Sequence, residues 1–256
     1  MALTTFNGFI AQVGALKTLT QPLYGEIQTA TNTLFAYSAA IVVRRIGDTK
    51  ALPNPLPSGI TGYIVTQFSC AGNVATTTSF QLVRLINLGE INLQLGFTDG
   101  SAMPTVTELG VSRATSSPIF CAVTTALNSA PGSIAITYTD QDGNTGQTST
   151  TEALTASSVV QSGGMPRLAS GDWGVRDITN ITQSGGTSPT GVVKCWGIIP
   201  LGMVPSVDLP GSNHVRNHVT DTLTHFRLGA GDQLGILQYG TNSTGMIVGD
   251  ITVIGE

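Results

Sequence analysis

Charged residues are scarce in this sequence. Asp, Glu, Lys and Arg make up 10% of the 256 residues, against about 25% in a typical soluble domain. A folded monomer of this length exposes on the order of 10,000 Å², which leaves roughly one charged side chain per 400 Å². We therefore expect other protein to cover much of the surface. So few charges would leave exposed apolar patches larger than the few hundred Å² that monomers tolerate. We therefore expect a symmetric homo-oligomer, with a trimer favoured.

Positive charge is scarcer still. The net charge is −4, and Arg44 and Arg45 are the only adjacent basic pair. A nucleic-acid-binding protein needs a clustered basic face, so the sequence argues against a nucleic-acid partner. No uninterrupted apolar run of 18 residues is present for a membrane-spanning helix. The first residues, MALTTF, also lack the basic start of a signal peptide, and we expect assembly in the cytoplasm and no membrane partner.

Cysteine is the third scarce type. The three cysteines are Cys70, Cys121 and Cys195. Their number is odd, their spacing is wide, and each lies among apolar or small residues. This pattern predicts buried free thiols that behave as small apolar side chains. It does not predict the disulfide framework of a small secreted domain.

What the chain does contain is a series of β-branched and aromatic runs separated by turn signals. Strands at this spacing are typical of an antiparallel sandwich or barrel. The sequence therefore predicts an all-β fold of the β-sandwich or jelly-roll type. The expected strands are 34–46, 60–68, 79–88, 90–97, 118–126, 133–139, 147–154, 175–182, 192–199, 223–228, 233–239 and 246–254.

Glycine-containing turns punctuate these runs. The pairs Asp99-Gly100 and Asp142-Gly143 predict tight hairpin turns, which need a positive φ. The glycine-rich segments 162–164 and 184–186 predict loops.

The first 30 residues have apolar side chains but no clear periodicity, because Gly8 and Gly14 interrupt a partial helical stripe. We expect residues 1–30 to form an N-terminal arm outside the central fold. Residues 31–256 are expected to form the β region, as one sandwich or as two packed sub-domains that divide near 128–132. The arm's candidate interface residues are Phe6, Phe9, Ile10, Val13 and Leu16.

The histidines are the most plausible metal ligands. His214, His218 and His225 lie close in sequence with Asp221 among them, and imidazole with carboxylate is a common zinc ligand set. No H-E-x-x-H is present, and the segment reads as a loop that enters a strand. We expect polar loop or interface histidines and no metal.

Other candidate motifs also have structural interpretations. The segment 140–144, DQDGN, resembles the start of a calcium loop, but its glycine is fourth rather than sixth, and a hairpin turn is favoured. The segment 229–235, GAGDQLG, precedes a strand rather than the helix that a dinucleotide-binding loop needs. No nucleophile elbow or phosphate-binding loop occurs. We expect a protein that is not an enzyme and has no cofactor.

Two tryptophans offer possible stacking surfaces. Trp173 and Trp196 are each flanked by strand residues, which favours packing in the core or at an interface over ligand stacking.

Three stretches together resemble a known class of protein. They are 97–105 (FTDGSAMPT), 131–144 (PGSIAITYTDQDGN) and 169–178 (ASGDWGVRDI). They are similar to segments of tailed-bacteriophage virion proteins of the kind that decorate or cement the head shell. The resemblance implies β-sandwich or jelly-roll subunits, often trimeric, on a capsid lattice. It implies the major capsid protein or other virion proteins as partners, and assembly into the virion in the host cytoplasm.

Three functions follow from these observations. The leading hypothesis is a capsid decoration or cement protein. A tail or fibre component that binds a host surface glycan is the first alternative, with Trp173 and Tyr239 as its candidate aromatics. A β-sandwich polysaccharide hydrolase is the second, and it would need two carboxylates within about 10 Å in a cleft.

Overall fold

Every regular element in the described part of the chain is a β-strand. The computed structural model describes residues 17–27, 33–35, 41–45, 62–72, 79–108, 111–160, 162–204, 214–217, 227–229, 233–239 and 245–255. The strand pairs β1–β18, β9–β13 and β8–β14 are antiparallel, and the predicted all-β fold is confirmed. Among these residues no helix is long and apolar enough to span a membrane.

The chain divides into two compact units. The first comprises Met1–Thr29, Arg44–Arg84 and Pro200–Glu256, and the second Ala30–Val43 and Leu85–Ile199. These divisions differ from the expected one near 128–132, a segment that lies inside the second unit. Two of the actual divisions fall within the long strands β4 (Ser79–Asn92) and β14 (Val192–Val204). Continuous strands have no linker composition, so no signal in the sequence marks these points.

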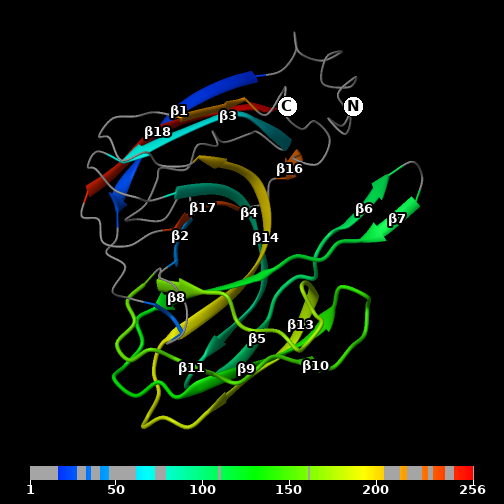
Figure 1. The fold of residues 1–256 in the computed structure, drawn as a ribbon, viewed down its shortest axis with the longest axis vertical. Helices are drawn as coiled ribbons and strands as arrows, with labels where there is room; N and C mark the ends of the chain where they lie inside the picture. The colour runs from blue at the N-terminus through cyan, green and yellow to red at the C-terminus, as the bar shows by residue number, and fades with distance from the viewer. Residues whose placement is uncertain are drawn as a thin grey trace. The chain divides into compact units, whose positions relative to one another are not determined.

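The first unit contains a five-stranded sheet with the order β1-β18-β3-β15, in which β16 also pairs with β3. Figure 1 labels β1, β18, β3 and β16 of this sheet. Its strands are β1 (Lys17–Ile27), β3 (Gly62–Gly72), β15 (His214–Asn217), β16 (Arg227–Gly229) and β18 (Gly245–Gly255), and β17 (Gln233–Tyr239) belongs to the same unit.

Part of the expected N-terminal arm lies in this sheet. β1 pairs with β18 along its whole length, from Lys17 opposite Gly255 to Ile27 opposite Gly245. Pro22 lies within β1, and an edge strand is where a sheet accepts proline. Residues 17–27 of the 1–30 segment are thus an edge strand, and any arm is confined to the residues before them.

The second unit contains a β-sandwich. In one layer, β13 pairs with one edge of β9, and the short strands β10 and β11 pair with β9 as well. The other layer has the order β14-β8-β12-β2 and includes β4, which pairs with β5 and β14. Figure 1 labels β2, β4, β5, β8 and β14. The remaining bounds are β2 (Ile41–Arg45), β5 (Gly96–Asp99), β8 (Ile119–Thr125), β9 (Ser133–Asp140), β10 (Gln147–Thr148), β11 (Glu152–Ala153), β12 (Ser162–Gly164) and β13 (Val175–Ser184). A separate hairpin pairs β6 (Thr105–Glu108) with β7 (Val111–Ala114).

One apolar core lies between the two layers. Alternate residues of β9 are buried, as expected for a strand that covers a core with one face. β9 and β13 contribute from one layer, and β4, β8 and β14 from the other. These core side chains are Ile86, Leu88, Ile91, Ile119, Cys121, Val123, Ile134, Ile136, Tyr138, Val175, Ile178, Ile181, Val193 and Cys195. Each large side chain buried this way contributes about 1.5–3 kcal/mol relative to its exposed state, and the predicted β-sandwich is confirmed.

Two glycine predictions were wrong for a shared reason. Residues 162–164 form strand β12 rather than a loop. Glycine is needed at 163 because the Phe120 ring packs directly on its backbone, and a Cβ there would lie 2.2 Å from Cζ of that ring. Asp99-Gly100 does not turn a hairpin. A Cβ on Gly100 would lie 2.3 Å from the backbone nitrogen of Gly89. Both glycines allow a close approach instead of a turn.

Candidate interaction site

The strands β9 and β13 run in opposite directions, with Ser133 opposite Ser184 and Asp140 opposite Val175. The loops that begin and end these strands therefore lie at the two ends of the sandwich. We call the end formed by 100–104, 141–146 and 165–174 the tryptophan end. We call the end formed by 93–95, 126–132, 155–160 and 185–191 the glycine end.

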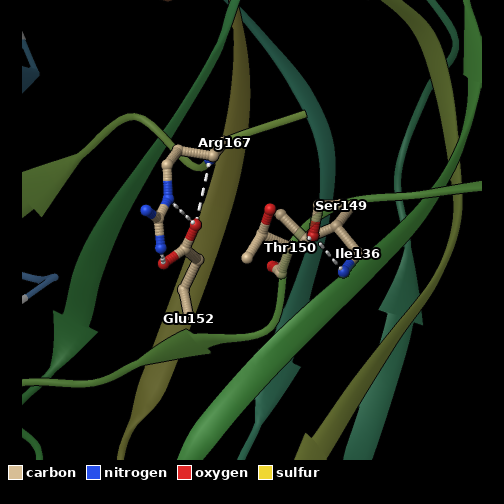
Figure 2. Close-up of polar contacts among 5 residues, drawn as sticks. All are labelled: Ile136, Ser149, Thr150, Glu152 and Arg167. Carbon is tan, nitrogen blue, oxygen red and sulfur yellow. Dashed lines mark hydrogen bonds and ion pairs between the residues drawn. The ribbon is translucent and has the colours of Figure 1, made fainter. Parts of the chain in front are cut away.

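An ion pair fastens the beginning of the 165–174 segment. Arg167 donates from Nε to Oε1 of Glu152 at 2.8 Å and from Nη2 to Oε2 at 3.0 Å, as Figure 2 shows. The Arg167 backbone N–H also donates to Oε1 at 3.3 Å, and the Arg167 carbonyl accepts from Thr150 N at 2.9 Å. Glu152 is 2% exposed and Arg167 is 59% exposed. The fork geometry fixes both side chains.

The strand edge that carries Glu152 is itself tied to β9. Ser149 Oγ accepts from Ile136 N at 2.9 Å, and Ser149 N donates to the Ile136 carbonyl at 2.9 Å (Figure 2). The ion pair is therefore attached to the rigid layer of the sandwich.

Tyr138 holds the middle of the segment. Its hydroxyl donates to Oδ2 of Asp172 at 2.6 Å and accepts from the backbone N–H of Ala169 at 2.9 Å. The ring is fully buried in the core. Burial and the bond to Asp172 raise the pKa of the Tyr138 hydroxyl to about 12.

Gln141 holds the end of the segment. Its Oε1 accepts from the backbone N–H groups of Trp173 at 3.2 Å and Gly174 at 3.3 Å. Its own carbonyl accepts from Nε and Nη2 of Arg176 at 3.1 and 2.6 Å. Side chains from three points of the sandwich thus position the backbone on both sides of Trp173.

The anchored segment presents an exposed tryptophan. Trp173 is 64% exposed, whereas Trp196 is 3% exposed and packs inside the unit. Of the two expected roles, packing in the core holds for Trp196, whereas Trp173 is not part of the core and only packing at an interface remains a prediction for it. Among the residues whose side-chain burial the structure describes, three other large apolar side chains are exposed, Leu95, Val159 and Val160, and these lie at the glycine end.

The acidic residues near Trp173 have their own partners. Asp140 accepts from the backbone N–H groups of Asp142 and Asn144 and from Nδ2 of Asn144, each at 2.8 Å. Burial raises the pKa of Asp140, but the bonds from Asn144, Asp142 and Gly143 outweigh it and hold that pKa below its usual value. The predicted hairpin turn between β9 and β10 is confirmed, and the carboxylate that resembled a calcium ligand closes this turn.

Asp99 at the end of β5 and Asp177 on β13 form a pair of interacting carboxylates. Burial, and then the negative charge of Asp99, raise the pKa of Asp177. Within the described part of the chain, no group of three or more His, Cys, Asp and Glu side chains is arranged to hold a metal ion.

Several predicted site residues lie outside the described residues. These are Phe6, Phe9, Ile10, Val13, Leu16, His218, Asp221 and His225. His214 is the first residue of β15, opposite Cys70, so the prediction of a strand rather than a helix at His214 is confirmed. Tyr239 ends β17, and the structure describes no surroundings for its side chain.

The residues that build the site were not found from the sequence. Glu152 and Arg167 are 15 positions apart, and Tyr138 and Asp172 are 34 apart, so no local pattern links them. The one useful signal was the set of three stretches singled out by resemblance. They meet at Arg176, whose carbonyl accepts from Met103 N at 2.7 Å and whose guanidinium binds Gln141.

Comparison with known proteins does not assign this chain to a family. No family model matches the chain, and no curated protein matches it.

Among solved structures, a mutant VP2 protein of infectious bursal disease virus in derived T=1 particles aligns with a TM-score of 0.23 and 9% identity over 98% of this chain and 83% of that one. A Merkel cell polyomavirus virus-like particle aligns with a TM-score of 0.19 and 10% identity over 93% of this chain and 72% of that one. The BFDV capsid protein in its 60-mer aligns with a TM-score of 0.19 and 11% identity over 94% of this chain and 92% of that one. TM-scores of this size do not establish a shared fold.

Proposed function

We propose that this chain is a structural component of a virus particle, of the kind that decorates or cements the capsid of a bacteriophage. It acts by protein–protein contact and catalyses no reaction. The observation that carries the proposal is the exposed Trp173 on a segment fixed by Glu152, Tyr138 and Gln141.

An exposed tryptophan on an anchored backbone is well suited to binding another protein. Tryptophan is enriched among the residues that dominate interface energetics, where truncation costs about 2 kcal/mol or more. A loop that is already ordered avoids much of the entropy cost of binding. The low charge content of 10% agrees with a surface that is covered in the assembled state.

Exposed tryptophan also supports the glycan-binding alternative, since aromatic rings stack on sugar faces. The distribution of apolar residues favours protein contact. Leu95 is 87% exposed at the glycine end, the opposite end of the sandwich from Trp173, and Val159 and Val160 are 40% and 42% exposed there. A subunit that bridges neighbours needs apolar contacts at more than one end, whereas a single sugar site needs one aromatic cluster.

The proposed partners are the major capsid protein and further copies of this chain, with a trimer favoured. The apolar residues Phe6, Phe9, Ile10, Val13 and Leu16 remain proposed attachment residues. Because β1 begins at Lys17, the deletion that tests them is residues 1–16. Removal of 1–30 would also take away an edge strand and confuse attachment with folding.

The test uses particles that contain this chain and the purified full-length protein. Imaging of the particles should locate the chain on the outer capsid surface with Trp173 against a neighbouring subunit. In a competition for vacant sites on stripped particles, Trp173→Ala should bind at least about tenfold more weakly than the wild type. Ser170→Ala, an exposed position on the same segment, is the matched control and should bind like the wild type.

Two results would overturn the proposal. One is location of the chain at a tail or fibre tip with Trp173 facing solvent, together with loss of glycan binding in Trp173→Ala. The other is equal binding of Trp173→Ala and Ser170→Ala to the capsid.

A further inference from the structure

Two cysteines face each other in the core of the second unit. Cys121 on β8 lies directly opposite Cys195 on β14 in the antiparallel register. Their sulfur atoms are 3.0 Å apart, and both residues are fully buried and free. They lie on the core-facing side of their strands, where Val123 and Val193 also belong to the core.

The backbone around this pair already suits a disulfide bond. A disulfide requires Cα atoms about 4.4–6.8 Å apart and an S–S length of about 2.05 Å. Directly opposed residues of an antiparallel pair have Cα atoms about 4.5 or 5.5 Å apart. The two sulfur atoms therefore need to approach by only about 1 Å, without a shift of either strand.

We propose that Cys121 and Cys195 are an oxidation site that forms an intramolecular disulfide when the chain meets a small-molecule disulfide such as oxidised glutathione. The thiolate of one cysteine attacks a sulfur of the oxidant, which releases one glutathione thiolate and leaves a mixed disulfide. The second cysteine then attacks the protein sulfur of that mixed disulfide and releases the second glutathione. Two electrons and two protons pass from the cysteines to the oxidant, which becomes two molecules of glutathione.

The surroundings of the pair determine when this reaction occurs. Burial, together with the hydrogen bond to Cys195, raises the pKa of the Cys121 thiol well above its ordinary value. The reactive thiolate is therefore rare in the folded chain, and the oxidant has no access to either sulfur. Oxidation is fast while the chain folds or when β8 and β14 separate, and slow in the folded state. The disulfide, once formed, cross-links residues 74 positions apart. It resists reduction because a reductant has no access to the buried sulfur atoms.

The test uses the full-length wild-type protein. One sample refolds from denaturant with oxidised glutathione, and a second is exposed to the same oxidant only after folding. Each is then denatured, alkylated and mapped by peptide mass. In the refolded sample we expect alkylation at Cys70 alone, and a peptide that links Cys121 to Cys195. The folded sample should reach this state at least about tenfold more slowly.

The melting temperature gives an independent readout. A link of this span should raise it by about 5–15 °C, and a reductant added in denaturant should reverse the rise. Cys70→Ser is the matched control and should retain the full shift, while Cys195→Ser should lose it. The proposal is overturned if three alkylated cysteines remain after oxidative refolding of the wild type, or if the linked peptide contains Cys70. Neither readout of the wild type depends on how well a cysteine variant folds.

Discussion

At the glycine end of the second unit, backbone groups bond mainly to the backbone of neighbouring loops. At the tryptophan end, side chains of neighbouring strands and of the β9–β10 turn bond to the 165–174 segment. At the glycine end, Leu93 N donates to the Gly191 carbonyl at 3.0 Å, and Thr187 N donates to the Ala130 carbonyl at 3.1 Å. At the tryptophan end, the corresponding positions are held by the side chains of Glu152, Tyr138 and Gln141.

The difference shows which parts of each end tolerate change. A loop held through its backbone depends on conformation, so glycine at a few positions decides whether the loops fit. A loop held by side chains depends on chemistry, since loss of a partner can leave a buried polar group such as the Glu152 carboxylate unsatisfied. The anchors of the second kind hold Trp173, the residue to which the proposed function assigns binding. Three changes test this contrast.

The largest effect is expected from a single methyl group at the glycine end. Gly186 has φ +84°, and a Cβ there would lie 2.6 Å from the Ala130 carbonyl oxygen. Gly186→Ala should lower the free energy of unfolding by about 3 kcal/mol or more, because the left-handed backbone and the clash both disfavour it. Urea denaturation followed by circular dichroism measures the change.

Gly185 provides the matched control. It has φ +66°, but a Cβ there meets nothing within 4 Å. Gly185→Ala should therefore cost only about 1–2 kcal/mol. Equal losses for the two variants would show that conformation alone matters at this end and that the loops do not fit closely.

The second effect is expected at the tryptophan end. Arg167→Ala leaves the carboxylate of Glu152, which is 2% exposed, without its ion-pair partner. Removal of one partner of a fully buried pair costs about 3–5 kcal/mol, and we expect about 2–3 kcal/mol here since Arg167 is largely exposed and water can replace it. Arg167→Lys keeps the charge but loses the fork, and should cost about 1 kcal/mol. If Arg167→Ala unfolds at the same urea concentration as the wild type, the ion pair does not anchor the segment.

The contrast between the ends also shows what the sequence could predict. The β-branched and aromatic run 133–139 predicted the strand β9, and the Asp142-Gly143 pair predicted the turn that follows. Both signals are local. The failures involved partners far apart in the sequence: Gly163 under the ring of Phe120, and Gly100 against Gly89. In the sequence, a glycine that lets another segment pack closely on its backbone cannot be told from a glycine that forms a turn. The two are distinguished only when the packing neighbour is known.

The same limit applies to the candidate site. The two tryptophans have similar strand-like surroundings in the sequence, yet Trp196 is buried and Trp173 is exposed. The distinction depends on where Gln141 and Tyr138 hold the segment, and neither residue is near Trp173 in the chain. Both residues lie in the stretch 131–144, whose pattern of apolar residues and turn signals does not show that it contacts residues 169–174.

The smallest effect is expected from Tyr138→Phe, and its dependence on pH makes it specific. The variant keeps the buried ring but removes the hydroxyl that binds Asp172 and Ala169, which should cost about 1–2 kcal/mol at pH 7. In the wild type the folded state raises the pKa of Tyr138 from 10.0 to about 12. Between these values the folded chain keeps a proton that the unfolded chain has lost, so this contribution is complete below pH 10 and declines as pH rises towards 12. The difference in unfolding free energy between wild type and Tyr138→Phe should therefore narrow over that range in urea titrations at several pH values. A difference that stays constant from pH 7 to pH 12 would show that the hydroxyl is not held as described, and that the Trp173 segment depends on the ion pair and Gln141 alone.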